Sequence, residues 1–95
     1  MKWIEVIKIR AAGTDFKFLK EILLPVGKLT QIGLSETVIY RNAVLESDWA
    51  IHLYWETASP EPNGSVLGLH LSRLVNDFGL IDHSVWINET KTLKS

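Results

Sequence analysis

With 95 residues the chain has room for one domain, and we expect a single domain over 1–95 with an ordered core at about 2–88 and a polar tail at 89–95. Ten Lys and Arg residues against eleven Asp and Glu residues leave a formal charge of −1, which excludes the basic surface typical of nucleic-acid-binding proteins. Hydrophobic residues make up 46% and charged residues 22%, as in globular rather than disordered chains. The absence of cysteine excludes disulfides, thiolate metal sites and cysteine nucleophiles.

The first residues predict neither a signal peptide nor a membrane anchor, because Glu5 and Lys8 interrupt any apolar run there. No other apolar stretch approaches the roughly 20 residues that a membrane-spanning helix needs. A cytoplasmic protein with no membrane partner is therefore expected.

Hydrophobic periodicity predicts the element order strand, helix, strand, strand, helix, strand. The first helix is expected to have Thr14 as its N-cap, and its apolar face is expected to consist of Leu19, Ile22, Leu23 and Val26. Pro25 lacks a backbone donor and should kink or end this helix near Leu24. The predicted strands lie at 3–10, 36–44, 48–56 and about 80–88.

The second helix follows a turn-rich link at 59–65 and is expected to begin at a cap formed by Asn63 or Ser65. Gly79 lies just past its end, where a left-handed cap residue belongs. Its predicted apolar face, at i, i+3 and i+4 spacing, consists of Leu67, His70, Leu71, Leu74, Val75 and Phe78. We expect Leu74 to be buried, so that truncation to alanine lowers the free energy of unfolding by about 2–5 kcal/mol.

This element order with right-handed crossovers predicts an α+β fold, a ferredoxin-like βαββαβ sandwich. Its four-stranded antiparallel sheet would carry two helices on one face and leave the other uncovered. In the third strand an apolar row suits the helix-covered face, namely Trp49, Ile51, Leu53 and Trp55. The other faces of the strands mix aromatic residues with His, Asn, Ser and Arg, which is typical of an interface or a pocket wall. We therefore expect a homodimer formed through this sheet face, burying at least roughly 1,000 Å² in total.

The sequence also resembles a known family. Gly33-Leu34-Ser35 leads into the strand at 38–42, and the next strand closes with Tyr54-Trp55-Glu56-Thr57. These segments look like the antibiotic biosynthesis monooxygenase-like group of the dimeric α+β barrel superfamily. The resemblance implies that two ferredoxin-like subunits pack sheet against sheet, with a cavity between each sheet and its helices.

Three residues are candidates for catalysis: His52, Tyr54 and His70. His52 and Tyr54 share one strand face, where they either exchange a proton with a polar substrate or serve only in packing. His70 is either a general base or haem ligand at the cavity edge, or a core histidine hydrogen-bonded to a backbone carbonyl. His83 is expected to be a surface or interface residue. The three histidines do not have the spacing of metal ligands, so no metal site is predicted.

Ligand-binding candidates lie on the same predicted sheet face as His52 and Tyr54, namely Asn42, Tyr40 and Trp86. Polar groups on an otherwise apolar face favour a shared partner, since each is costly to bury alone. A small aromatic ligand that packs against these residues is the expectation.

Two functions from different classes fit these patterns. One is a non-catalytic dimeric module that binds a small ligand or a partner protein. The other is a cofactor-independent monooxygenase or isomerase acting on a small aromatic substrate, and neither function requires a cofactor. The chain has no phosphate-binding or serine-hydrolase motif. RNA-recognition modules share the element order, but the third strand here lacks their glycine and basic residues.

Overall fold

The computed structural model describes residues 1–11 and 16–90, and within them the chain has the predicted βαββαβ order. The elements are β1 (Lys2–Ala11), α1 (Phe16–Val26), β2 (Leu34–Arg41), β3 (Asp48–Glu56), α2 (Val66–Val75), the short 3-10 helix η1 (Asn76–Phe78) and β4 (Gly79–Ile87). Strand β3 has the predicted bounds. Strand β2 begins earlier and ends earlier than predicted, because Asn42 belongs to the turn that leads into β3.

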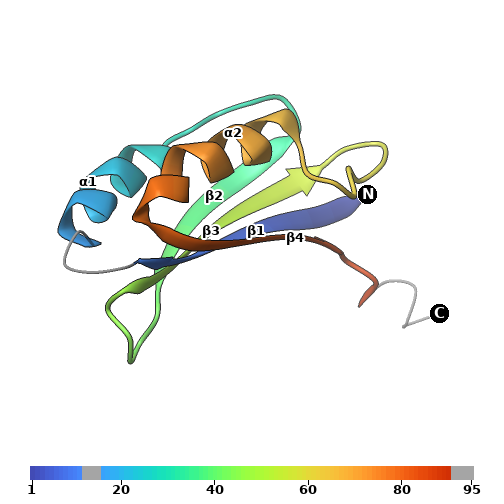
Figure 1. The fold of residues 1–95 in the computed structure, drawn as a ribbon. Helices are drawn as coiled ribbons and strands as arrows, with labels where there is room; N and C mark the ends of the chain where they lie inside the picture. The colour runs from blue at the N-terminus through green and yellow to red at the C-terminus, as the bar shows by residue number, and fades with distance from the viewer. Residues whose placement is uncertain (12–15, 91–95) are drawn as a thin grey trace.

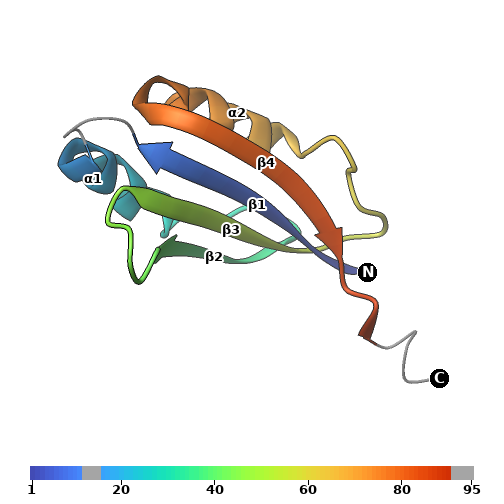
Figure 2. The same cartoon turned by 60° about the horizontal axis from the view of Figure 1, so that its bottom comes forward.

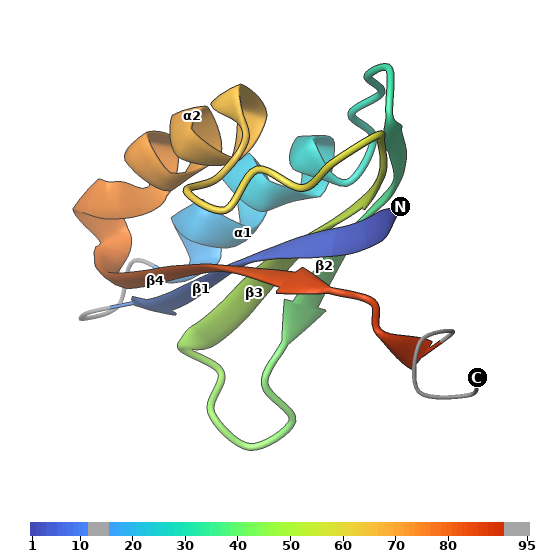
Figure 3. The ribbon, with the colours of Figure 1, turned by 90° about the vertical axis from the view of Figure 1, so that its right-hand side faces the viewer.

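The four strands form one antiparallel sheet in the order β2-β3-β1-β4. Both helices cover the same face of this sheet, and no helix or strand of residues 1–11 and 16–90 covers the opposite face (Figures 1 and 3). The view onto the sheet shows β1 and β3 at its centre and β4 and β2 at its edges (Figure 2). The protein therefore has the predicted ferredoxin-like α+β fold.

Strand register assigns each residue to one of the two sheet faces. Trp3 pairs with Trp55 and Ile7 pairs with Ile51, so the buried side chains of β1 and β3 share the helix-covered face, except Val6, which pairs with His52 on the other face. The indole rings of Trp3 and Trp55 stack with their centroids 5.5 Å apart. The alternation in β3 predicted these faces correctly. We call the other side of the sheet the open face.

Helix α1 buries Leu19, Leu23 and Val26 against the sheet, as the periodicity predicted, whereas Ile22 is only half-buried. The helix continues through Pro25 and ends at Val26, so the expected end near Leu24 is wrong by two residues. A proline is tolerated there because the helix stops one residue later and only one backbone hydrogen bond is lost. The predicted Thr14 cap lies outside the described residues.

Helix α2 is rotated relative to the predicted apolar face. Its buried residues are Gly68, Leu71 and Val75, while His70 and Leu74 are exposed, Leu74 by 46%. The expectations of a core His70 and a buried Leu74 are therefore wrong. Leu67 and Phe78 are partly buried against the core. The physical reason is that Gly68 lies on the helix face nearest the sheet. A pattern of large apolar side chains does not identify a face that contains a glycine.

The start of α2 agrees with the prediction, and its end does not. Ser65 is the N-cap, and its side chain accepts a hydrogen bond from the backbone N–H of Gly68. Gly79 is the C-cap of η1 and also the first residue of β4, but its backbone is extended rather than left-handed. A Cβ atom at Gly79 would lie 1.9 Å from the carbonyl oxygen of Arg10. Glycine is required here by the close approach of β4 to β1.

Among the described residues, neither helix has the length and apolarity needed to cross a bilayer.

Candidate functional site

Three of the predicted site residues gather on the open face. The ring centroids of Tyr40 on β2 and His52 on β3 lie 4.5 Å apart in an edge-to-face arrangement. The His52 and Tyr54 rings lie 6.1 Å apart, and the hydroxyl oxygens of Tyr40 and Tyr54 lie 3.2 Å apart within hydrogen-bonding distance. The alternation of these strands correctly placed the three side chains on one face.

This aromatic cluster changes the titration of two of its members. Partial burial lowers the pKa of His52 below its usual value, and the positive charge of Lys8 lowers it further. The hydrogen bond with Tyr40 raises the pKa of Tyr54, with smaller contributions from burial and the charge of Glu36. Both groups therefore favour their neutral forms, which suits a surface that packs against another molecule.

Asn42 lies at the end of the cluster, just after β2. Its side-chain oxygen accepts hydrogen bonds from the backbone N–H groups of Val44 and Leu45, so it shapes the turn before β3. Tyr40 and Asn42 also border a pocket of about 540 Å³ at this end of the sheet. Its other lining residues include Lys8, Arg10, Arg41, Asp48 and Asp82. The pocket thus combines an aromatic wall with charges of both signs.

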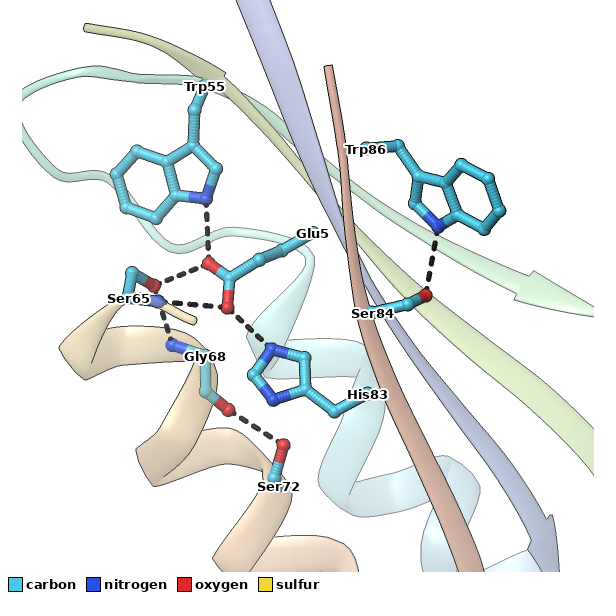
Figure 4. Close-up of polar contacts among 8 residues, drawn as sticks. All are labelled: Glu5, Trp55, Ser65, Gly68, Ser72, His83, Ser84 and Trp86. Carbon is cyan, nitrogen blue, oxygen red and sulfur yellow. Dashed lines mark hydrogen bonds and ion pairs between the residues drawn. The ribbon is translucent and has the colours of Figure 1, made fainter. Parts of the chain in front are cut away.

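The remaining two candidates, Trp86 and His70, lie outside this aromatic cluster. Trp86 on β4 shares the open face, but Ile4 on the intervening strand separates it from Tyr54. Trp86 donates to the hydroxyl oxygen of Ser84, and its side chain projects from β4 on the side opposite His83 (Figure 4). His70 lies on the exposed surface of α2, on the helix-covered side of the sheet. The structure therefore does not bring His70 together with His52 and Tyr54.

The most heavily hydrogen-bonded polar side chain belongs to a residue that the sequence patterns did not single out. Glu5 on β1 faces the helices and is completely buried. Its Oε1 accepts from Trp55 Nε1 at 2.9 Å and from the Ser65 hydroxyl, and its Oε2 accepts from the Ser65 backbone N–H at 3.1 Å. His83 Nε2 lies 2.6 Å from Oε2 (Figure 4). Four groups from three residues thus occupy the approximately four acceptor positions of the Glu5 carboxylate.

The N-terminus of α2 explains why a carboxylate is stable in this position. Ser65, which caps the helix, contacts Glu5 through both its backbone and its side chain. The partial positive charge at a helix N-terminus favours a nearby anion. Gly68, in the first turn, leaves the necessary space, because a Cβ atom there would lie 1.8 Å from Oε2 of Glu5.

His83 has a different role from the predicted one. Instead of being a surface or interface residue, it lies on the helix-covered face with 16% of its side chain exposed, and it pairs with Glu5. Its ring packs closely against Gly64, where a Cβ atom would lie 2.4 Å from the ring carbon between the two nitrogens. The positive φ of Gly64 also favours glycine at this turn.

One signal for the Glu5 cluster was present in the sequence. Glu5 has the same strand parity as Trp3, Ile7 and Ile9, which places a carboxylate in an otherwise apolar, core-facing row. A charge in such a row requires partners. Those partners are 50 to 78 positions away along the chain, so no local pattern identifies them.

Within residues 1–11 and 16–90, no three His, Asp or Glu side chains are close enough to hold a metal ion. The chain matches no family model, no curated protein and no solved structure. Conclusions about its function therefore depend on the geometry of its own residues.

Proposed function

We propose that the protein is a homodimeric binding module in which two copies pair through their open faces, as in the dimeric α+β barrel superfamily that the sequence resembles. The observation that carries the proposal is the cluster of Tyr40, His52 and Tyr54 on a sheet face that no helix or strand in the described part of the chain covers. Around it, Leu80 and Trp86 are 74% and 61% exposed. Aromatic and aliphatic side chains gathered on one face are typical of an interaction surface.

The charges of the open face support a second copy as its occupant. Lys2, Lys8 and Arg10 lie on β1, and the carboxylates lie on the other three strands, namely Glu36, Asp48, Glu56 and Asp82. With three positive and four negative groups, the face has almost no net charge, so two identical faces do not repel each other. Cations on β1 and carboxylates on the other three strands allow pairing between copies.

The dimensions of the sheet support the same occupant. Four strands spaced about 4.8 Å apart, each with about eight residues rising about 3.3 Å, cover on the order of 500 Å². Two such faces together reach about 1,000 Å², near the lower limit of a stable interface. The sheet face is thus large enough for a dimer only if most of it takes part.

The pocket beside Tyr40 and Asn42 supports ligand binding at the edge of this interface. The side-chain oxygen of Asn42 is committed to the turn, whereas its amide group can donate to a ligand. A small aromatic ligand would stack on Tyr40 and accept from Asn42. In this proposal Trp86 contributes to the dimer contact rather than to the ligand site.

The alternative of a monooxygenase or isomerase that uses His52, Tyr54 and His70 together has less support. His52 and Tyr54 lie on the open face, and His70 lies on the exposed side of α2 across the sheet. A substrate cannot touch all three residues of one subunit. The binding module is therefore the preferred function.

Sedimentation equilibrium at micromolar concentration tests the proposal. The wild-type protein is expected to have twice the monomer mass, and the double variant Tyr40→Glu/Trp86→Glu, whose changes lie on the open face, is expected to be monomeric. Leu24→Glu is a matched control, because Leu24 is 58% exposed on α1, on the other side of the sheet, and this variant should remain dimeric. A monomer mass for the wild-type protein would contradict the proposal.

A further inference from the structure

The Glu5–His83 pair has a feature that a structural role does not require. Its two residues lie on the helix-covered side of the sheet, so pairing of the open faces leaves them uncovered. His83 borders a pocket of about 240 Å³ together with Pro62, Asn63 and Val85. A buried carboxylate therefore holds an imidazole ring that reaches solvent on its other side.

The hydrogen bonds define which ring nitrogen is available. A carboxylate only accepts hydrogen bonds, so Nε2 of His83 carries the proton that it shares with Glu5. In the neutral ring the lone pair is then on Nδ1. Among the described residues, Thr37 Oγ1 is the only fully buried side-chain nitrogen or oxygen without a partner, and no partner contacts Nδ1. Nδ1 is therefore not fully buried, and His83 is one of the residues that line the pocket.

The surroundings keep the ring in this orientation. Gly64 packs against the ring edge, and Gly68 lets the carboxylate approach the start of α2. Trp55 and Ser65 hold the other positions of the carboxylate. A base or nucleophile oriented by a hydrogen-bonded acidic group is a recurring arrangement in acyl transfer.

We propose that Nδ1 of His83 is a nucleophile toward small acyl compounds in the pocket beside Pro62 and Asn63, and that Glu5 is its positioning residue. The pocket is small, and its lining includes Asn63, a residue whose side-chain amide can donate a hydrogen bond to a carbonyl oxygen. An acetyl group attached to a good leaving group is the kind of substrate that fits.

In the first step, the Nδ1 lone pair forms a bond to the acyl carbon. The bond from that carbon to the leaving oxygen breaks, and the leaving group departs with the electron pair as an anion. The ring then carries the acyl group on Nδ1 and the original proton on Nε2. Glu5 stabilises this cationic ring through its bond to Nε2.

In the second step, water attacks the acyl carbon and gives both of its protons to solvent, one during the attack and one when the released acid ionises. The carbon–nitrogen bond breaks, and its electron pair returns to Nδ1. The net reaction is hydrolysis of the acyl compound to a carboxylate and the leaving group. It needs only water as a co-reactant.

Hydrolysis of 4-nitrophenyl acetate, followed by the absorbance of released 4-nitrophenolate, tests the nucleophile. His83→Gln retains a donor for Glu5 and is expected to lower the protein-dependent rate at least about tenfold, a modest effect for a positioned catalytic group. His70→Gln, whose side chain is exposed on α2, is the matched control and should keep most of the rate. Equal rates for wild type and His83→Gln would overturn the proposal, as would loss of the rate in the control.

The positioning role of Glu5 is tested by diethyl pyrocarbonate, which acylates unprotonated imidazole and leaves a product that peptide mass spectrometry locates. In the wild-type protein His83 should react at least about tenfold faster than His70, although His70 is more exposed. Glu5→Gln should remove this difference while circular dichroism still shows a folded chain. If Glu5→Gln does not fold, nitrogen-15 NMR of the wild-type protein decides: an Nε2-protonated His83 supports the role of Glu5, and an Nδ1-protonated ring contradicts it.

Discussion

At Glu5 a charged group is removed from water and compensated by partners from three other parts of the chain. The partners come from β3, the start of α2 and β4. Removing one member of a buried charged cluster is costly, because the others lose their partner while remaining buried. Glu5 therefore holds the sheet and α2 together as well as orienting His83.

The first prediction concerns the charge of Glu5. Glu5→Gln should lower the free energy of unfolding by about 3–5 kcal/mol, because the amide replaces an acceptor with a donor that faces other donors. Urea unfolding measures the change. Glu36→Gln is the matched control, since Glu36 is exposed on β2, and it should change stability by less than about 0.5 kcal/mol. A loss below about 1 kcal/mol for Glu5→Gln would show that the cluster contributes little.

The second prediction concerns the space beside Glu5. In most helices, replacing glycine by alanine stabilises by roughly 1 kcal/mol. Gly68→Ala should instead destabilise by about 2 kcal/mol or more, because its Cβ atom would overlap the Glu5 carboxylate. Thermal unfolding shows directly whether the substitution raises or lowers the stability. A higher melting temperature for Gly68→Ala would mean that the carboxylate moves aside without loss.

The third prediction follows from the lowered pKa of His52. The imidazole of His52 is harder to protonate in the folded protein than in the unfolded chain. The unfolded chain therefore binds more protons around the usual pKa of 6.5. The contribution of His52 to stability is thus present above 6.5 and is lost as the pH falls through its folded pKa. Between about pH 8 and pH 5, the wild-type melting temperature should fall more than that of His52→Gln. Parallel melting curves across this range would contradict the assignment.

At the scale of elements, α2 shows how a helix can be predicted in the right place with the wrong face inward. Large apolar residues surround most of this helix, so the i, i+3, i+4 pattern allows more than one face. Packing selects the face that brings Gly68 against Glu5, and this choice turns His70 and Leu74 outward. Strands are less ambiguous, because a period of two leaves only two faces to choose between.

The fourth prediction distinguishes the two possible faces of α2. Leu71→Ala should lower the free energy of unfolding by about 2–5 kcal/mol, because Leu71 is buried in the core and truncation leaves a cavity. Leu74→Ala should cost less than about 1 kcal/mol, since almost half of that side chain is exposed. Denaturant titration of both variants measures the difference. A larger loss of unfolding free energy for Leu74→Ala than for Leu71→Ala would instead support the buried face predicted from the sequence.

At the scale of the whole molecule, the two sides of the sheet have different roles. The helix-covered side holds the apolar core and the Glu5–His83 pair, and the open face holds the aromatic cluster. A 95-residue domain buries only about 60–65% of its unfolded surface, so its core alone gives modest stability. Association through the open face would add buried area that the single chain lacks.

The fifth prediction tests this whole-molecule consequence. If folding is coupled to dimer formation, the melting temperature should rise with protein concentration, because association favours the folded state by mass action. Scanning calorimetry from about ten to several hundred micromolar measures the rise. The Tyr40→Glu/Trp86→Glu variant should have a melting temperature independent of concentration.

The sequence by itself determined the order of the elements, the ferredoxin-like fold and the faces of the strands. These depend on local periodicity, capping and turn residues, and on the few topologies that right-handed crossovers permit. The grouping of Tyr40, His52 and Tyr54 followed from the same alternation and from neighbouring strands joined by a short turn.

Only the tertiary structure decided the face of α2 and the partners of Glu5. Both depend on contacts between segments far apart in the chain: Ser65 lies 60 positions from Glu5, and His83 lies 78 positions from it. No local sequence pattern predicts that a carboxylate, a helix N-terminus and two glycines lie in contact. The packing of α2 onto the sheet creates these contacts, and it turns His83 from an expected surface residue into the partner of a buried charge.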